Sequence, residues 1–284
     1  MSANPRLSLN QATIKYASLS TALDVVSAAG LESIGLWREP VAEVGLDAAV
    51  QLVADSGLRV SSLCRAGFFT MAEGPTRRAS IDENRRAIAE TAALGAPTLV
   101  LVAGGLPEGS RDLAGARERV RDAIGELAPD AAAAGISLAI EPLHPMYVSD
   151  RAVVSTLGQA LDIATQFDSS TVGVVVDTFH VFWDPQVLEQ IARAGAGGYI
   201  ASYQVCDWAT PLPADVLLAR HYPGHGVIDF GPLTRAVVEA GYTGDIEVEI
   251  FNQAIWDAQP VDVVERTIAA FEASIAADLE AVRV

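Results

Sequence analysis

Four short apolar runs in the second half of the chain each end in an oxygen-bearing side chain. These side chains are Glu141, Asp177, Gln204 and Glu249. Any one of them alone is compatible with a loop cap, but three carboxylates brought together would repel one another unless a cation lay between them. Ligands that are all oxygen favour a hard divalent ion. We therefore predict that these four residues bind one divalent metal ion, Mn²⁺ or Mg²⁺, with Co²⁺ as an alternative.

Histidine and arginine follow the same runs. His144 and His180 each stand three residues after a predicted metal ligand, and Arg220 and His221 come after the run that ends in Gln204. Histidine can transfer protons near neutral pH, and arginine presents a planar cation to hydroxyl, carboxylate or phosphate oxygens. We predict that all four residues bind the substrate. A surface turn with a solvated arginine is the alternative for Arg220.

A second carboxylate, Glu247, shares a strand face with Glu249 but lies one layer deeper. Burial of an unpartnered carboxylate is costly, so a cation or hydrogen-bond donor is expected beside it, although the sequence does not identify which. Aromatic and cationic residues at the ends of earlier runs either wall the same pocket or serve packing and ion pairs. They are Trp37, Arg38, Cys64, Arg65, Phe68 and Phe69.

The elements that position these residues alternate along the whole chain. Strand-like runs occupy residues 7–10, 33–37, 59–64, 98–103, 137–142, 172–177, 200–205 and 245–251. Segments with helical periodicity occupy residues 19–29, 46–55, 80–94, 111–134, 154–167, 186–194, 232–240 and 262–279. This alternation is typical of βαβ units, and eight units predict a single (β/α)8 TIM-barrel domain over residues 1–284. A doubly wound open sheet is the alternative, but no glycine-rich dinucleotide turn supports it.

Composition limits the partners. The formal net charge is −17, which would repel nucleic acid and anionic membrane surfaces, and no apolar run approaches the ~20 residues of a membrane span. The two cysteines, Cys64 and Cys206, lie in apolar runs and form no disulfide framework. We expect a cytoplasmic protein that acts on a small polyhydroxylated substrate.

Four short segments resemble signatures of the sugar phosphate isomerase/epimerase superfamily, the xylose-isomerase-like barrels. They are residues 140–144 (IEPLH), 177–180 (DTFH), 223–226 (PGHG) and 249–252 (EIFN), and the likeness extends over essentially the whole chain. The resemblance implies four metal ligands at the ends of the fifth to eighth strands: a Glu, an Asp, then either a His or a Gln, and a second Glu. Gln204 in the third place is similar to hydroxypyruvate isomerase, whereas inosose isomerases and ketose 3-epimerases usually have histidine there. The resemblance also implies that the protein forms a homodimer or a homotetramer.

Three functions are compatible with these residues. The first is an isomerase or epimerase in which Glu141 and Glu249 act as base and acid while the metal stabilises an enediolate of a keto sugar, keto acid or inosose. The second is a lyase that uses the same chemistry to dehydrate, decarboxylate or cleave a 3-keto glycoside. The third, which the intact ligand set disfavours, is a non-catalytic barrel subunit.

Overall fold

The strands of the barrel follow the predicted runs closely. A computed structural model describes residues 4–280. The strands are β1 (Leu7–Asn10), β2 (Ser33–Trp37), β3 (Arg59–Gly67), β4 (Thr98–Val102), β5 (Ser137–Glu141), β6 (Val172–Asp177), β7 (Ile200–Val205), β8 (Asp207–Trp208), β9 (Arg220–His221) and β10 (Ile246–Val248). Within the described residues, eight of them pair in parallel around a closed barrel in the order β1-β10-β7-β6-β5-β4-β3-β2. The predicted (β/α)8 barrel is confirmed, and the open sheet is excluded.

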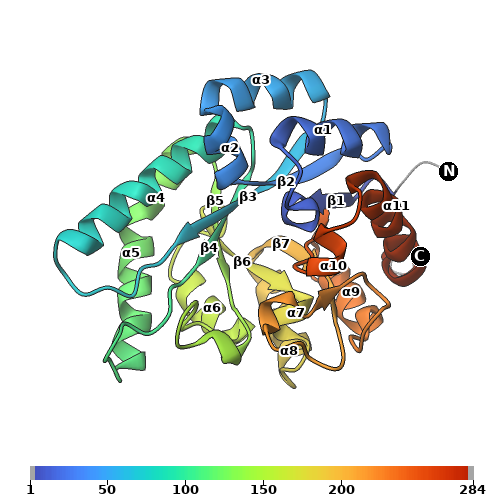
Figure 1. Ribbon diagram of the computed structural model, residues 1–284. Coiled ribbons are helices and arrows are strands. Elements are labelled where there is room, and N and C mark those ends of the chain that lie inside the picture. The colour runs from blue at the N-terminus through green and yellow to red at the C-terminus, as the bar shows by residue number, and fades with distance from the viewer. Residues whose placement is uncertain (1–3, 281–284) are drawn as a thin grey trace.

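Helices form a ring outside the strands (Figure 1). They are α1 (Leu19–Ala28), α2 (Arg38–Val44), α3 (Leu46–Ser56), α4 (Pro75–Ala93), α5 (Leu113–Ala134), α6 (Leu157–Ala164), α7 (Thr178–Val181), α8 (Val187–Ala196), α9 (Phe230–Glu239), α10 (Gln253–Trp256), α11 (Pro260–Phe271) and α12 (Ala277–Glu280). Short 3-10 turns occupy η1 (Gln11–Ile14), η2 (Pro145–Tyr147) and η3 (Val216–Leu218), and a π turn, η4 (Glu272–Ala276), joins α11 to α12. All eight predicted helices are present, and α2, α7 and α10 are short additions. The predicted domain limits, residues 1 and 284, lie outside the described residues.

Strand register places the predicted site residues on the inner face of the barrel. Gln204 pairs with Asp177 on one side and with Glu247 on the other, and Val102 pairs with Glu141. Below them lies a small apolar cluster that is separate from the main core: Cys64, Val100, Ala139 and Val175. The alternation of side chains across each strand therefore produces the inward-facing set that the sequence predicts.

Two strands differ from their predicted bounds by more than one residue. β3 continues to Gly67, three residues past Cys64, and thus includes Arg65. β10 ends at Val248, so Glu249 follows the last ladder position rather than lying within a longer strand. In addition, β8 and β9 form a small antiparallel sheet after β7 that the sequence did not predict.

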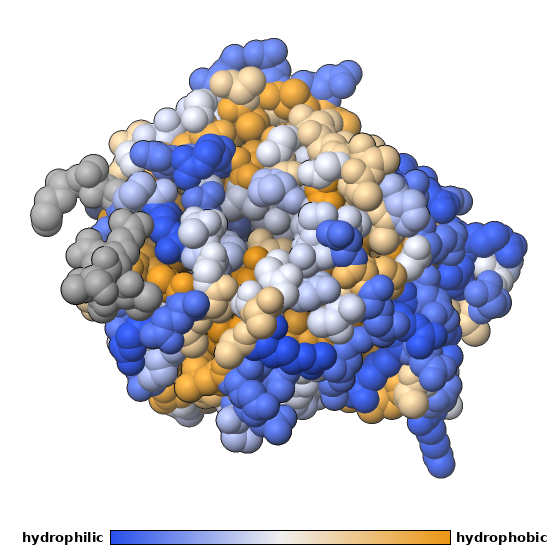
Figure 2. All heavy atoms as spheres, turned by 180° about the vertical axis from the view of Figure 1, so that it is seen from behind, coloured by the Kyte–Doolittle hydropathy of each residue, from blue (hydrophilic) through white to orange (hydrophobic). Residues whose placement is uncertain are grey.

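The outer surface is mixed in character. On the face turned away from Figure 1, hydrophilic residues dominate the right-hand side, and a band of hydrophobic residues lies just below the upper edge (Figure 2). None of the helices in residues 4–280 is both long enough and apolar enough to cross a membrane.

Gly35 in β2 gives a direct test of the packing inside the barrel. A Cβ atom there would lie 2.5 Å from the carboxyl carbon of Glu247. We expect Gly35→Ala to lower the free energy of unfolding by about 1–3 kcal/mol, measured by urea titration, because the hydrogen-bonded carboxylate would have to move.

Gly125→Ala in α5 is the matched control. Its Cβ would make an ordinary contact at 3.5 Å with Phe167, so the substitution should leave stability equal or raise it by up to ~1 kcal/mol, as expected for glycine replaced in a helix. Equal stability of Gly35→Ala and the wild type would show that Glu247 is free to move.

Candidate active site

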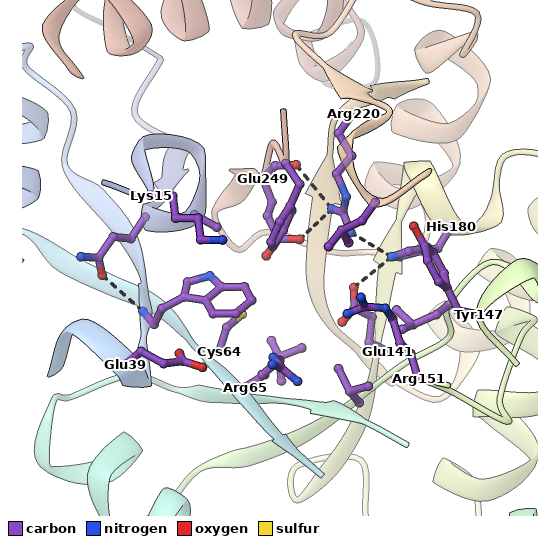
Figure 3. Close-up of a pocket in the computed structure, with 18 of the residues that line it drawn as sticks. Lys15, Glu39, Cys64, Arg65, Glu141, Tyr147, Arg151, His180, Arg220 and Glu249 are labelled. Carbon is purple, nitrogen blue, oxygen red and sulfur yellow. Dashed lines mark hydrogen bonds and ion pairs between the residues drawn. The ribbon is translucent and has the colours of Figure 1, made fainter. Parts of the chain in front are cut away.

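A cavity opens at the carboxyl ends of the barrel strands, where active sites of this fold lie. Its volume is about 390 Å³, and its lining includes Glu141, His180, Arg220 and Glu249. Figure 3 shows these four side chains turned toward one another, with Arg220 between Glu249 and His180. Trp37, Cys64, Arg65 and Phe68 also line it, as one of the two interpretations predicted, whereas Arg38 pairs with Glu83 and Glu90 outside it.

Three carboxylates are buried at the inner end of this cavity. Glu141 is 6% exposed, Asp177 is 0% exposed and Glu249 is 4% exposed. Burial raises the pKa of all three, and for Glu141 the negative charges of Glu249 and Asp177 raise it further. The pKa of Glu249 rises to about 7 because burial outweighs the opposing effect of Arg220. A cluster of this kind needs nearby positive charge to stay ionised at neutral pH.

Arg220 supplies one such charge. Its Nη1 lies 2.7 Å from Oε2 of Glu249 and 3.2 Å from Oδ2 of Asp177. The guanidinium is held between the rings of Phe179 and Phe251, at 4.8 and 4.9 Å from their centroids. An arginine that contacts two aromatic rings and pairs with two carboxylates is restrained, which limits where its remaining N–H groups point.

The ring of His180 faces a donor at each of its two nitrogens. The backbone N–H of His144 lies 3.1 Å from Nδ1, and Nη2 of Arg220 lies 2.9 Å from Nε2. Burial holds the pKa of the imidazole well below its usual value, so the ring is neutral. A neutral imidazole accepts a hydrogen bond at one nitrogen and carries its proton on the other, so the ring can accept from only one of these two donors at a time.

Glu247 fixes the side chain of Gln204. The carboxylate, 1% exposed, accepts hydrogen bonds from Asn10, Ser61 and Ser62 and from Nε2 of Gln204 at 3.0 Å. These are the donors expected beside Glu247. Because a carboxylate only accepts, the amide must present its nitrogen to Glu247, and Oε1 of Gln204 is left buried without a partner among the described residues.

The residues present are suited to a hard cation. Ligand atoms of Glu141, Asp177 and His180 lie within 4.8 Å of one another. The unpartnered oxygen of Gln204, on the strand that pairs with β6, is a further oxygen donor that a cation would satisfy. Of the four predicted metal ligands, Glu141 and Asp177 are drawn together, Glu249 is held by Arg220, and Gln204 is held by Glu247.

Two predicted substrate-binding residues lie outside the cavity lining. The ring of His144 packs beside Trp183 and Trp208, and its backbone N–H orients His180. The ring of His221 stacks on His225 at 5.1 Å. Their role in substrate binding stays a prediction, and the structure gives His144 a positioning contact.

Sequence reasoning did not identify Asp207, which anchors the segment that carries Arg220. This residue is 0% exposed and accepts hydrogen bonds from the backbone N–H groups of Trp208, Gly226 and Ile228. Asp207 also pairs with His221 across the β8–β9 sheet. The available signal was a charged residue two positions after an apolar strand, but its partners come from a loop nineteen residues away.

A family model for xylose isomerase-like TIM barrels matches residues 23–274 of the chain. The chain belongs to this xylose isomerase-like family.

Several solved structures and curated enzymes are similar to the chain. Protein SMc04130 from Sinorhizobium meliloti has 44% identity and a TM-score of 0.92, over 95% of this chain and 98% of that one. The IolI protein, crystallised with a zinc atom, has 21% identity and a TM-score of 0.83, over 96% and 98%.

A 3-dehydroshikimate dehydratase of Pseudomonas aeruginosa is 30% identical over 50% of this chain and 22% of its own length. An inosose isomerase of Halalkalibacterium halodurans is 25% identical over 49% of this chain and 48% of its own length. The chain therefore matches less than half of the length of these curated relatives, both of which are enzymes.

Removal of the arginine from this xylose isomerase-like site should be costly. We expect Arg220→Leu to lower the free energy of unfolding by about 3–5 kcal/mol in EDTA at pH 8, because Asp177 and Glu249 lose the cation that neutralises them. Urea titration followed by circular dichroism measures the change.

Arg78→Leu is the control, since Arg78 is exposed on α4 and makes no ion pair among the described residues; a loss of less than about 0.5 kcal/mol is expected. An equally small loss for Arg220→Leu would mean that the carboxylates do not depend on this charge.

Proposed function

We propose that this chain is a divalent-metal-dependent isomerase or epimerase that acts on a keto sugar, a keto acid or an inosose. The observation that carries the proposal is that Glu141 and Glu249 face one cavity together with His180 and Arg220. Such a cavity provides groups that can move a proton at carbon and groups that can hold the neighbouring oxygen.

In this proposal the metal ion is held by Glu141, Asp177, Gln204 and Glu249, with Mn²⁺ or Mg²⁺ favoured and Co²⁺ as an alternative. The orphaned Oε1 of Gln204 and the closeness of Glu141 to Asp177 support this assignment. A zinc atom in the IolI structure, which shares the fold, is consistent with it. When bound, a divalent ion supplies Lewis-acid stabilisation of negative charge on a carbonyl oxygen.

The protein groups divide the remaining work. Glu141 on β5 and Glu249 after β10 approach the cavity from different sides of the barrel, so one carboxylate removes a proton from the substrate carbon and the other returns one. Arg220, whose Nη2 lies beside Nε2 of His180, donates to a substrate oxygen and fixes its orientation. Burial of all four side chains excludes bulk water from the reacting end.

A lyase reaction is the second candidate. It is favoured by the match between half of this chain and a dehydratase, a relative as similar as the isomerases. The same proton removal would then be followed by loss of a leaving group, which a histidine would protonate. Product analysis by NMR in D2O distinguishes the two reactions, because an isomerase keeps every atom of the substrate in one product whereas a lyase releases a second species.

Both glutamates are testable by conservative substitution. We expect Glu141→Gln and Glu249→Gln each to lower turnover by at least a hundredfold, because an amide cannot accept or return the proton. Turnover is followed by NMR with a panel of ketoses, inososes, hydroxypyruvate and 3-keto glycosides, together with deuterium uptake from D2O. Circular dichroism verifies that each variant is folded. Wild-type activity in either variant would rule out the assigned acid–base pair.

Metal binding is testable without turnover. After EDTA treatment and dialysis against Mn²⁺, we expect one ion per chain by elemental analysis and a higher melting temperature. Gln204→Leu should weaken binding roughly tenfold to a hundredfold because it removes an oxygen donor.

Gln51→Leu, an exposed glutamine on α3, should bind the ion as the wild type does. If the wild type binds no divalent ion, the metal proposal is wrong and a non-catalytic barrel subunit becomes the better interpretation. Light scattering on the same samples measures the predicted dimer or tetramer.

A further inference from the structure

The cavity carries more positive charge than the proposed chemistry uses. Besides Arg220, its lining includes Lys15, Arg65 and Arg151. Lys15 is the one lysine of a chain with 36 acidic residues. Figure 3 shows Arg65 and Arg151 entering the cavity from the lower edge of the view and Arg220 from the upper edge. Lys15, Arg65 and Arg151 therefore line the part of the cavity next to Glu141, His180, Arg220 and Glu249.

Arg65 is the best placed of the three to bind a ligand. It is half-buried on β3, and its guanidinium carbon lies 5.1 Å from the ring centre of Phe68 and 5.8 Å from that of Trp37. No carboxylate in the described part of the chain forms an ion pair with it. Aromatic contacts restrain the guanidinium while its N–H donors stay available, and these donors match a carboxylate or phosphate in a bidentate geometry.

Lys15 and Arg151 add to the same field. Nζ of Lys15 lies 4.3 Å from the ring centre of Trp256, and among residues 4–280 it forms no ion pair. Arg151 lies over the ring of Tyr147, and its Nε is 3.4 Å from a carboxylate oxygen of Asp150 without the alignment of a hydrogen bond. Lys15 therefore has no carboxylate partner among the described residues, and Arg151 has one, the exposed Asp150.

The charges at the inner end of the cavity balance without these residues. Glu141, Asp177 and Glu249 supply three negative charges, which Arg220 and a bound divalent ion would neutralise. Glu39 and Glu43 also line the cavity, but both side chains are exposed. A half-buried arginine is screened less than such surface groups. The positive charge of Arg65 is therefore available to a ligand.

We propose that the substrate is an anion whose carboxylate or phosphate group binds Arg65, with Lys15 and Arg151 nearby, while its reacting end faces Glu141 and Glu249. The placement of the reacting end rests on the proposed function, but binding of the anionic group does not. The proposal narrows the substrate class from keto sugars, keto acids and inososes in general to those that carry a carboxylate or phosphate.

Binding of matched ligands tests this without any turnover. Isothermal titration of the Mn²⁺-treated protein would compare D-glucitol with D-gluconate, in which a carboxylate replaces one terminal CH2OH group, and with D-glucitol 6-phosphate. We expect at least one of the two anions to bind tenfold or more tightly than D-glucitol, and the preferred anion distinguishes carboxylate from phosphate. Binding of D-glucitol as tight as that of both anions, or no binding of either anion, would overturn the proposal.

Two variants that each remove one positive charge test whether Arg65 causes the preference for an anion. Arg65→Gln should reduce the preference for the anion to threefold or less, whereas Arg78→Gln, which removes the same charge from an exposed position on α4, should leave it unchanged. An unchanged preference in Arg65→Gln would refute the assignment to Arg65. Circular dichroism and melting temperature verify that both variants are folded. If no compound of the ketose panel is turned over but the preference for the anion persists, the proposed reaction fails while the anion site stands.

Discussion

The mutual repulsion of three buried carboxylates is the constraint on which the rest of this site depends. Glu141, Asp177 and Glu249 come from three different strand ends, yet all are less than a tenth exposed. Three negative charges out of water are tolerated only beside positive charge. In the structure, Arg220 occupies that position by bridging Asp177 and Glu249. The segment around Arg220 is accordingly held by Asp207, by the β8–β9 sheet and by two aromatic rings.

One layer deeper in the barrel, the buried carboxylate of Glu247 is stabilised without a cation. Glu247 is surrounded by hydroxyl and amide donors, and Gly35 leaves the space that its carboxylate needs. Hydrogen bonds from neutral donors can stabilise a buried carboxylate when enough of them converge. This arrangement affects Gln204 in the layer above. The side-chain amide of Gln204 donates its N–H to Glu247, so the amide oxygen of Gln204 is the atom that a cation can bind. Glu247 thus determines that Gln204 presents an oxygen, and not a nitrogen, to the predicted metal site.

The barrel and its inward-facing carboxylates could be predicted from sequence because both follow local periodicity. Alternating side chains in strands β5, β6 and β7 determine which residues face inward, and the apolar runs end where the ladder ends. Partners that come from loops could not be predicted. The contacts of Asp207 with Gly226 and Ile228 depend on a loop conformation, and the outward position of His144 depends on packing against Trp183 and Trp208. The extension of β3 that includes Arg65 arises from pairing with β4.

The net charge of the chain does not show that several of its few cations line one cavity. A net charge of −17 would keep anions away from most of the surface. Surface charges are weakened by water and salt over roughly 10 Å, whereas half-buried charges are weakened much less. Arg65 and Arg220 therefore keep positive charge in the cavity even though acidic residues outnumber basic ones in the chain as a whole. An anion that reaches the cavity would meet Arg65 and Lys15 first and Arg220 only at the inner end, so the positive groups that select a ligand are distinct from the one that neutralises the buried carboxylates.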